Sequence, residues 1–331
     1  MDNDIVISSR IRLARNLRDS KFSTKISQEE AYKVIEAVKN VVENNEVTSK
    51  LEFELKYLKD IADIEQNILV EQHIISPQLL KNKSKAAFMI SKDKSITIMI
   101  NEEDHLRIQV LNSGLNLEEC LKTANLIDDI LEESLDYAYD KDLGFITSCP
   151  TNIGTGLRAS TMLHLPALSM TNQLEKLLLA ISQIGVAVRG VYGEGTKSMG
   201  NLYQISNQGT LGAQEETLVE RIKQITMQLV EKENSTREHL LNNNRILIEN
   251  EVYRAYGILK NARIIDTQEA MKLLSVVKMG IEMGILEGMD AKNIDNLMTK
   301  VQANNIQMML DEGFTKNERN FKRAQILRDE V

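Results

Sequence analysis

The stretch from Ser95 to Gln109, SITIMINEEDHLRIQ, limits most narrowly how this chain can fold. In its first half, isoleucines at every second position alternate with Thr97, Met99 and Asn101. A period of two predicts a half-buried β-strand. The polar turn SKDK separates this strand from residues 85–90, so the two segments together predict a β-hairpin.

Three consecutive carboxylates, Glu102, Glu103 and Asp104, follow the predicted strand. Like charges repel, and each would have to lose water to pack, so most such triplets are solvated turns. The alternative is a base held at the mouth of a pocket, opposite a cation or an abstractable proton. The triplet alone leaves both interpretations open.

The composition limits the class of protein. The 331 residues suffice for one large domain with a small one, or for two of medium size, and 42% are hydrophobic. A net charge of −8 argues against a general binder of nucleic acid or of anionic membranes, so any anion site must be local. The two cysteines give neither a disulfide framework nor a zinc spacing, which fits a reducing cytoplasm. The sequence starts without an apolar signal core and has no apolar run of membrane-span length.

Hydrophobic periodicity predicts further strands and helices. The expected strands cover residues 4–8, 85–90, 95–101, 106–111, 143–148, 185–191 and 202–206. The expected helices cover residues 27–43, the first part of 51–70, 116–139, 174–184 and 213–244, and the remainder is helical throughout. Cys120 lies on the apolar face of one helix, so we expect it in the core. A shift in composition near Arg245 predicts two domains, at residues 1–245 and 246–331.

Two segments are suited to binding anions. Arg10 and Arg12 are two residues apart in an extended segment, so both guanidinium groups point to one side and suit phosphate oxygens. Cys149 precedes a glycine-rich loop and Arg158, where backbone amides and the arginine would favour a thiolate. A basic surface strand and a merely buried cysteine remain open as alternatives.

Two other features carry weaker signals. His73 stands alone, and a lone histidine is more often a packed or surface residue than a ligand contact. Gly190 and Gly195 have the spacing of a P-loop, but Thr196 stands where the lysine should follow, so we reject a Walker A motif. The segment YGEGTKSMGN is either a mobile loop that closes over a substrate or a plain hairpin loop.

Four segments, taken in order, resemble the phosphagen (guanidino) kinases. They are SSRIRLARN, NEEDHLR, CPTNIGTGLR, and RGVYGEG followed by YQISN. The resemblance covers roughly residues 5–235 and implies an α+β fold, in which an antiparallel β-sheet flanked by helices precedes an all-α C-terminal domain. The chain lacks that family's N-terminal helical domain and carries a helical C-terminal domain instead, an arrangement similar to that of the bacterial protein-arginine kinases.

The resemblance implies a binding site for ATP with Mg²⁺. The side chains that would grip the phosphates or lie near the adenine are Arg10, Arg12, His73, Arg107, Arg158 and Arg189. Phosphoryl transfer needs alignment and positive charge on the phosphates rather than covalent help, which five arginines could supply. The metal would be held mostly by phosphates and water, so we expect no ligands from protein side chains.

The resemblance also assigns residues around a substrate guanidinium. Glu103 and Glu194 would pair with it and Cys149 would lie beside it, while Asp104 belongs to the same acidic motif as Glu103. A guanidinium is a poor nucleophile because its charge is delocalised and its pKa exceeds about 12. Two carboxylates can orient it and accept its proton as the N–P bond forms. A thiolate would favour the cation electrostatically.

The function implied by the resemblance is ATP-dependent phosphorylation of arginine side chains in proteins, marking them for Clp-type degradation and stress-response control. A free-arginine kinase and a non-catalytic adaptor that binds nucleotide or phosphoarginine are the alternatives. The implied partners are arginine-containing protein substrates, a zinc-binding activator protein, a transcriptional repressor, a Clp ATPase and a second copy of the chain. Nucleic acid and membranes are not expected partners, and the cytoplasm is the expected compartment.

One C-terminal segment departs from the pattern that the resemblance implies. The protein-arginine kinases carry an RDxxRA-type motif linked to allosteric recognition of phosphoarginine, and the matching residues here are Arg319, Asn320 and Arg323. Asn320 stands at the acidic position, and its amide can accept a hydrogen bond but offers no charge to a guanidinium. We therefore expect weaker phosphoarginine feedback.

Overall fold

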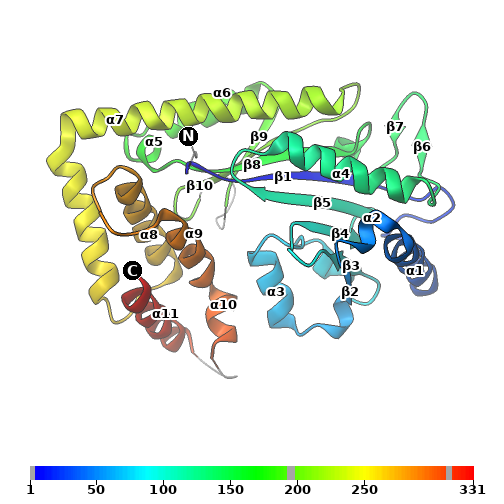
Figure 1. Cartoon of the computed structure of the whole chain (residues 1–331), viewed down its shortest axis with the longest axis horizontal. Coiled ribbons are helices and arrows are strands. Elements are labelled where there is room, and N and C mark those ends of the chain that lie inside the picture. Colours follow the sequence, from blue (N-terminus) through cyan, green and yellow to red (C-terminus); the bar gives the residue numbers. More distant parts are fainter. Residues whose placement is uncertain (1–3, 192–197, 311–314) are drawn as a thin grey trace.

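The computed structural model describes residues 4–191, 198–310 and 315–331. Within them, an eight-stranded antiparallel sheet runs through the middle of the molecule in the order β2-β3-β4-β5-β1-β8-β10-β9 (Figure 1). The strands are β1 (Val6–Arg15), β2 (Glu54–Tyr57), β3 (Ala87–Ile90), β4 (Ile96–Ile100), β5 (Leu106–Ser113), β8 (Leu157–His164), β9 (Val186–Gly190) and β10 (Leu202–Asn207), and a separate hairpin pairs β6 (Tyr139–Asp140) with β7 (Gly144–Phe145).

Helices cover one face of the sheet and continue beyond it (Figure 1). The helices are α1 (Gln28–Asn44), α2 (Glu46–Ser49), α3 (Asp63–Glu71), α4 (Leu117–Glu132), α5 (Pro166–Met170), α6 (Leu174–Gln183), α7 (Glu215–Asn261), α8 (Thr267–Glu282), α9 (Ala291–Lys300), α10 (Ala303–Met308) and α11 (Lys316–Glu330). Apolar residues of α1, α4 and α7 form one core with inward side chains of the sheet such as Ile11, Leu13 and Ile108. This arrangement confirms the expected α+β class with an antiparallel sheet flanked by helices.

The helix expected at residues 27–43 shows how local sequence sets an element boundary. Ser27 caps α1, because its hydroxyl accepts the Glu30 N–H (3.2 Å) while the Glu30 carboxylate accepts the Ser27 N–H (2.9 Å). Val34, Ile35 and Val38 form part of its buried face. The helix expected at residues 27–43 is confirmed.

β4 differs from the half-buried strand that its alternation predicts, because all of its residues are buried. Its isoleucines join the core under α1 and α4, as expected. Met99 on the other face packs with Leu58, Ile75 and Phe88 of a second core. The chain between β2 and β3 folds back beneath the sheet and covers this face, a long-range event that a period of two does not reveal.

Other boundaries were also predicted incorrectly. The segment after residue 51 begins with edge strand β2 rather than a helix, and α4 ends at Glu132 rather than near residue 139. Only Gly144 and Phe145 of the strand expected at 143–148 pair in a ladder. β9 is an edge strand with partial exposure, not a buried one.

The chain turns sharply within its longest helix. Asn244 in α7 has non-helical backbone angles (φ −135°, ψ 30°), and α8, α9 and α11 pack around the part of α7 that follows (Figure 1). Met271, Met279 and Met298 are buried in this C-terminal core. Among the helices of the described ranges, none combines the length and apolarity needed to cross a membrane.

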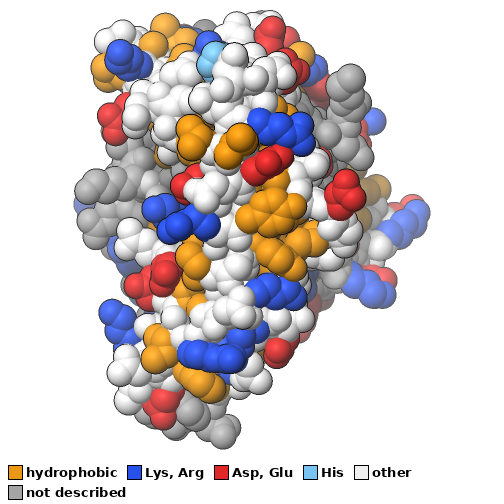
Figure 2. Space-filling view, turned by 90° about the vertical axis from the view of Figure 1, so that its left-hand side faces the viewer, with side chains coloured by type: hydrophobic (Ala, Val, Ile, Leu, Met, Phe, Trp, Pro, Cys, Tyr) orange, Lys and Arg blue, Asp and Glu red, His pale blue; other side chains and the backbone are white. Residues whose placement is uncertain are grey.

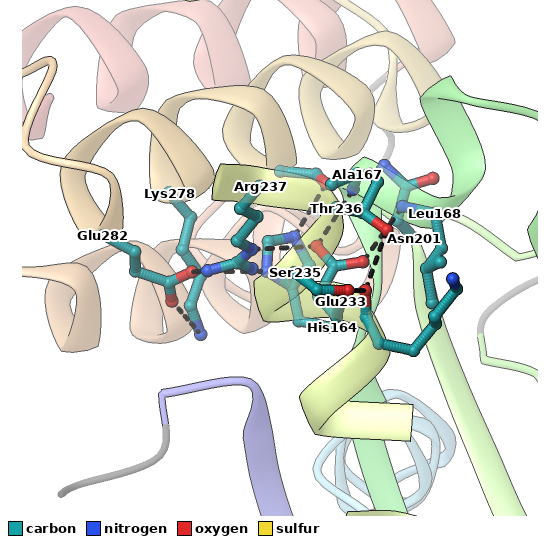
Figure 3. A network of polar contacts seen from close by, with 12 residues as sticks. His164, Ala167, Leu168, Asn201, Glu233, Ser235, Thr236, Arg237, Lys278 and Glu282 are labelled. Carbon is teal, nitrogen blue, oxygen red and sulfur yellow. Dashed lines mark hydrogen bonds and ion pairs between the residues drawn. The ribbon is translucent and has the colours of Figure 1, made fainter. Parts of the chain in front are cut away.

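A buried polar network joins the sheet to the C-terminal helices (Figure 3). The Glu233 carboxylate of α7 accepts the N–H groups of Ala167 and Leu168 at the start of α5 (2.9 and 3.0 Å). Arg237, one turn further on, donates to Glu233 (2.9 Å) and to Glu282 of α8 (2.7 Å). Pairing reduces the penalty that burial would otherwise impose on these charges.

The same junction fixes the start of β10. The hydroxyl of Ser275 on α8 lies 2.8 Å from both His164 Nε2 and Asn201 Nδ2. Asn201, which has a positive φ of 54°, also accepts the Leu165 N–H through its backbone oxygen (2.9 Å). The C-terminal helices therefore hold the residue that leads into β10.

Candidate active site

Strand register gathers the candidate phosphate-binding arginines on one face of the sheet. Ile11 and Leu13 of β1 face α4 and α7, so Arg10 and Arg12 face the opposite side. Arg12 lies directly opposite Arg158 of β8, and Ala14 lies opposite Arg107 of β5. We call this side, which also carries Arg189 opposite Gln204, the site face.

A cleft of about 560 Å³ opens on the site face. Its lining brings together most of the residues expected to bind ATP or substrate, namely Arg12, Glu103, Arg107, Cys149, Arg158 and Arg189. The rest of the lining consists of Ala14, Ser76, Pro77, Gln78, Lys81, Thr151, Asn152 and Gly156. Glu194 lies outside the residues that the structure describes, so its predicted role stays a prediction.

The turn that carries the three carboxylates is held from several sides. Asn101, with a positive φ of 58°, donates through Nδ2 to the backbone oxygens of Ala31 and Lys85 (3.0 and 3.1 Å). Asn82 Nδ2 in turn donates to the backbone oxygens of Asn101 and Glu102 (3.2 and 2.9 Å). These bonds fix a backbone that would otherwise be a flexible acidic loop.

The three carboxylates have different environments, and none of them is a fully solvated charge. Glu102 is buried and pairs with Arg107 at 2.6 Å, and its carboxylate also accepts a hydrogen bond from Ser76. Asp104 is buried as well, whereas Glu103 is half-buried and faces the cleft. The interpretation as a wet acidic turn is therefore wrong for this triplet.

Asp104 supports the site without lining the cleft. Its Oδ1 accepts the backbone N–H of Ser148 (2.6 Å) and the side-chain amide of Asn16 (2.7 Å). The Ser148 hydroxyl donates to the backbone oxygen of Glu103 (2.9 Å). Asp104 thus links the turn that holds Glu103 to the residue before Cys149.

Glu103 is suited to accept a proton. Burial and the neighbouring Asp104 raise its pKa above the ordinary value, while Arg107, with Nη2 at 3.7 Å, opposes the rise. A carboxylate with a raised pKa is a stronger base than a solvated one. The role that the resemblance assigned to Glu103 stays a prediction.

Cys149 reaches the same cleft from a loop that needs glycine. The Cys149 thiol lies 3.0 Å from the Thr151 hydroxyl. Gly156, which ends the loop, has a φ of 65°, and a Cβ there would lie 2.6 Å from the Ala14 backbone oxygen. Only glycine tolerates both the angle and the approach, so Gly156 sets the distance between the Cys149 loop and β1.

The arginines form a cationic site with few carboxylates. Burial, followed by repulsion from Arg107 and Arg158, lowers the pKa of Arg10 to about 10. Burial and the other arginines also lower the pKa of Arg12, whose buried Nε has no hydrogen-bond partner within the described part of the chain. Unpartnered guanidinium nitrogens and mutual repulsion are what a bound polyphosphate would relieve, so these residues fit ATP.

The same side chains offer little to a metal ion. In the ranges described above, no cluster of three or more His, Cys, Asp or Glu residues is arranged to hold one.

His73 and Arg10 lie beside the main cleft rather than in its lining. They border a separate cavity of only about 10 Å³, together with Gln204. His73 has a positive φ of 59°, and its backbone oxygen accepts a hydrogen bond from Gln109 of β5 (2.9 Å). Burial and the nearby Arg10 and Arg12 lower the pKa of His73 to about 4, so its ring is neutral at pH 7.

The C-terminal candidates do not form an open site around Arg323. This side chain is buried and donates to the backbone oxygens of Val301 (2.7 Å) and Ile265 (3.1 Å) and to Asn320 Oδ1 (2.7 Å). Arg319 donates to Gln307 (2.9 Å). Arg323 therefore holds α11 against the chain before α8, and recognition of phosphoarginine by this segment stays a prediction.

Several residues that shape the site were not identified from the sequence. Glu102 was seen only as part of the acidic triplet, and Asn16, Gln204 and Ser206 were not assigned a role. Gln204 and Ser206 stand in the YQISN segment, whose alternation places both on the site face. That spacing was the available signal.

The chain belongs to the ATP:guanido phosphotransferase family, whose C-terminal catalytic domain matches residues 33–236. Residues 245–331 match the C-terminal domain of the protein-arginine kinase McsB. The family that the motifs resemble is therefore confirmed.

Curated relatives extend this similarity over nearly the whole chain. A protein-arginine kinase of Clostridium kluyveri is 46% identical over 327 residues, which cover 99% of this chain and 94% of the relative. One from Halalkalibacterium halodurans is 47% identical over 328 residues, covering 99% and 92%. One from Caldanaerobacter subterraneus subsp. tengcongensis is 44% identical over 324 residues, covering 98% and 96%.

Solved structures share the fold at lower identity. A lombricine kinase is similar with a TM-score of 0.59 and 24% identity, over 71% of this chain and 68% of that one. The duplicated taurocyamine kinase of Schistosoma mansoni has a TM-score of 0.63 and 23% identity, over 96% of this chain and 42% of that one.

Proposed function

We propose that this chain transfers the γ-phosphoryl group of ATP to an arginine side chain of a protein substrate. The observation that carries the proposal is one cleft in which four arginines converge with Glu103 and Cys149. Cationic groups in such a cleft suit a triphosphate, and a half-buried carboxylate suits a guanidinium. The full-length similarity to protein-arginine kinases supports the substrate.

The residues divide the chemical work. The arginines bind and align the phosphates, and Arg107 lies between them and the two glutamates of the turn. Glu103 orients the guanidinium and accepts one of its N–H protons as the N–P bond forms. The bond between the γ-phosphorus and the bridging oxygen breaks, and ADP leaves with that electron pair. Mg²⁺ bound to the phosphates would add positive charge.

Cys149 and Glu194 complete the proposed substrate site. The thiol of Cys149 lies on the same cleft as Glu103, where a thiolate would favour the guanidinium cation without forming a covalent bond. Glu194 is proposed from the resemblance alone.

An assay with two acceptors tests the proposal. The protein is incubated with Mg-ATP and either free arginine or an arginine-bearing protein, and acid-labile phosphate is measured. Label on the protein supports the proposal. Label on free arginine alone would indicate a free-arginine kinase, and ATP binding without any label would indicate an adaptor.

We further propose a boundary at residue 245 between a catalytic domain and a helical domain that forms a dimer. The kink at Asn244 supports the boundary, although Val191 and Leu202 of the first part contribute to the C-terminal core. Figure 2 shows the end of the molecule formed by the second half of α7, where apolar side chains gather among charged ones. Ile246 and Tyr253, two helical turns apart on α7, are 80% and 55% exposed.

A second copy of the chain is the proposed occupant of this surface. Sedimentation equilibrium of the full chain should show a dimer, and Ile246→Lys should shift it to monomer. A zinc-binding activator, a repressor and a Clp ATPase, together with cytoplasmic localisation, stay predictions from the resemblance.

A further inference from the structure

Arg10 forms a hydrogen bond with a side chain that lies two strands away on the site face. Its Nη2 donates to the side-chain oxygen of Gln204 at 2.6 Å. Arg10 lies on β1 and Gln204 on β10, with β8 between them, so the two long side chains meet above β8. The bond fixes the direction of a guanidinium that would otherwise have several rotamers to choose from.

The partner is neutral, which distinguishes Arg10 from Arg15 and Arg237, two buried arginines that stabilise the fold through carboxylates. Arg15 pairs with Asp128 at 2.6 Å, and Arg237 pairs with Glu233 at 2.9 Å. Within the described ranges, no carboxylate lies within ion-pair distance of Arg10. A carboxylate would orient a guanidinium more strongly than an amide does, but it would also neutralise the charge.

Arg158 shows the same pattern. Its Nε and Nη2 both lie 3.3 Å from the hydroxyl of Ser206, which is two residues after Gln204 on β10. Alternate positions on one strand therefore supply neutral acceptors to two arginines from neighbouring strands. β10 therefore orients both Arg10 and Arg158 through uncharged side chains.

A second neighbour of Arg10, His73, is also uncharged. His73 and Gln204 border the same cavity of about 10 Å³ beside Arg10, which has room for about one water molecule at most. Burial and the nearby arginines lower the pKa of His73 to about 4, so the imidazole adds no charge at pH 7. Neither Gln204 nor His73 therefore neutralises the positive charge of Arg10.

We propose that Gln204 is a positioning residue for nucleotide binding, which aims Arg10 at the phosphates through a neutral oxygen and so preserves its charge for them. The inference rests on the proposed function, in which the ligand is a nucleoside polyphosphate. Gln204 acts through Arg10 and does not take part in the chemical step. Ser206 does the same for Arg158.

Two substitutions of nearly equal size separate orientation from charge. Gln204→Met removes the acceptor and leaves Arg10 charged, whereas Gln204→Glu keeps an acceptor and neutralises Arg10. The dissociation constant of Mg-ADP is measured by calorimetry for the full chain, alongside KM for ATP and for a protein substrate. Gln183→Glu, at the exposed end of α6, is the control for one added negative charge.

We expect Gln204→Met to weaken Mg-ADP binding about two- to threefold and Gln204→Glu about tenfold or more, because a lost charge pair with phosphate outweighs lost orientation. In both Gln204 variants, KM for the protein substrate should stay at the wild-type value. In the control variant Gln183→Glu, the dissociation constant of Mg-ADP and both KM values should stay at the wild-type values. Gln204→Met on an Arg10→Met background should cause no further loss, since its effect runs through Arg10. Thermal melting confirms that each variant folds.

Three results would overturn the inference. Gln204→Glu could bind Mg-ADP as tightly as wild type, which would mean that the neutrality of the partner is unimportant. If Gln204→Met and Gln204→Glu weakened Mg-ADP binding equally, Gln204 would only orient Arg10, and the part of the inference that concerns charge would be wrong. A folded wild type that binds no nucleotide would overturn the proposed function as well, and is distinguishable because the failure precedes any substitution.

Discussion

The guanidinium of Arg107 lies 2.6 Å from the buried carboxylate of Glu102, which also accepts a hydrogen bond from Ser76. Its other terminal nitrogen is 3.7 Å from Glu103 in the cleft. Arg107 is thus shared between a buried carboxylate and one that lines the cleft. The structural pair keeps Arg107 from moving fully onto Glu103, which preserves the basicity of Glu103.

Glu102→Gln tests this division. We expect a loss of about 1–3 kcal/mol in the free energy of unfolding, because the variant removes the charge from a buried hydrogen-bonded pair. Arg107 should then move toward Glu103, lower its pKa and shift the acid limb of the rate profile to lower pH. Urea unfolding and a pH–rate profile measure both effects.

Glu52→Gln is a suitable control, because Glu52 makes an exposed pair with Lys92. It should change stability by less than about 1 kcal/mol and leave the rate profile unchanged. An unchanged acid limb in Glu102→Gln would show that Arg107 does not respond to Glu102.

The pH dependence of activity should reflect the environment of Glu103. Burial and Asp104 raise its pKa above the ordinary value of 4.5, and the ionised form is the one that accepts a proton. Activity should therefore fall as the pH drops through a value above 4.5. The same raised pKa means that the charged form destabilises the folded state, a penalty present at neutral pH and relieved by acid.

Initial rates between pH 5 and 8, with both substrates saturating, would locate this limb. A limb that remains unchanged in Glu103→Asp and in Glu102→Gln would assign the titration to another group.

Asp104 should matter for positioning rather than for proton transfer. Asp104→Ala would leave the Ser148 N–H and the Asn16 amide without their buried acceptor, at a cost of about 1–3 kcal/mol in stability. We expect kcat to fall while KM for ATP stays near the wild-type value. Asp104→Asn retains an oxygen acceptor and should recover much of the loss.

The comparison of the two variants is the informative measurement. A catalytic carboxylate would be inactivated equally by Asn and by Ala. Recovery with Asn supports a positioning role, and equal loss would contradict it.

We expect the charge of Arg12 to lower the stability of the ligand-free protein and to raise its affinity for nucleotide. Burial and three neighbouring arginines lower its pKa well below the usual range, so its charge destabilises the folded state without ligand. Arg12→Met should therefore melt at the same or a higher temperature than wild type when no nucleotide is present. It should also lose most of the thermal shift that Mg-ADP produces, with affinity reduced about tenfold or more.

Arg12→Lys separates charge from geometry, since lysine keeps the charge but cannot bind in a bidentate way. Intermediate affinity is expected. A ligand-free melting temperature that drops sharply in Arg12→Met would show that Arg12 is a structural residue instead.

Gly156 should be intolerant of any side chain. Gly156→Ala would place a Cβ 2.6 Å from the Ala14 backbone oxygen at a φ of 65°, so the Cys149 loop must shift. We expect a stability loss of about 1–3 kcal/mol with reduced kcat. Gly209→Ala, whose Cβ would meet nothing within 4 Å, is the matched control and should behave as wild type.

The sequence predicted many of the residues on the site face, but few of the long-range contacts that hold them in place. Alternation along β1 placed Arg10 and Arg12 on one side, and the motifs identified Arg107, Arg158 and Glu103, because strand period and short spacings are local properties. The structure brings most of these residues to one cleft. Their chemical roles stay predictions until variants are assayed.

The remaining features depend on contacts between distant segments. Glu102, Glu103 and Asp104 are adjacent and chemically similar, yet Ser76 and Arg107 bury the first while Asn16 and Ser148 bury the third. No local pattern distinguishes them. The two-sided burial of β4 has the same origin, since the segment that covers Met99 comes from the chain before β3.

The most direct test of the account is phosphoarginine formation by Glu103→Gln, measured by mass spectrometry on an arginine-bearing protein, together with Mg-ADP affinity. Glu103 lines the cleft beside Arg107 but makes no structural pair as close as that of Glu102. We expect wild type to form phosphoarginine. We expect the variant to lose activity about 10²- to 10⁴-fold while its Mg-ADP affinity stays within about twofold of wild type. Retention of activity by the variant, or loss of nucleotide binding in a folded variant, would contradict the assignment of Glu103 as the base.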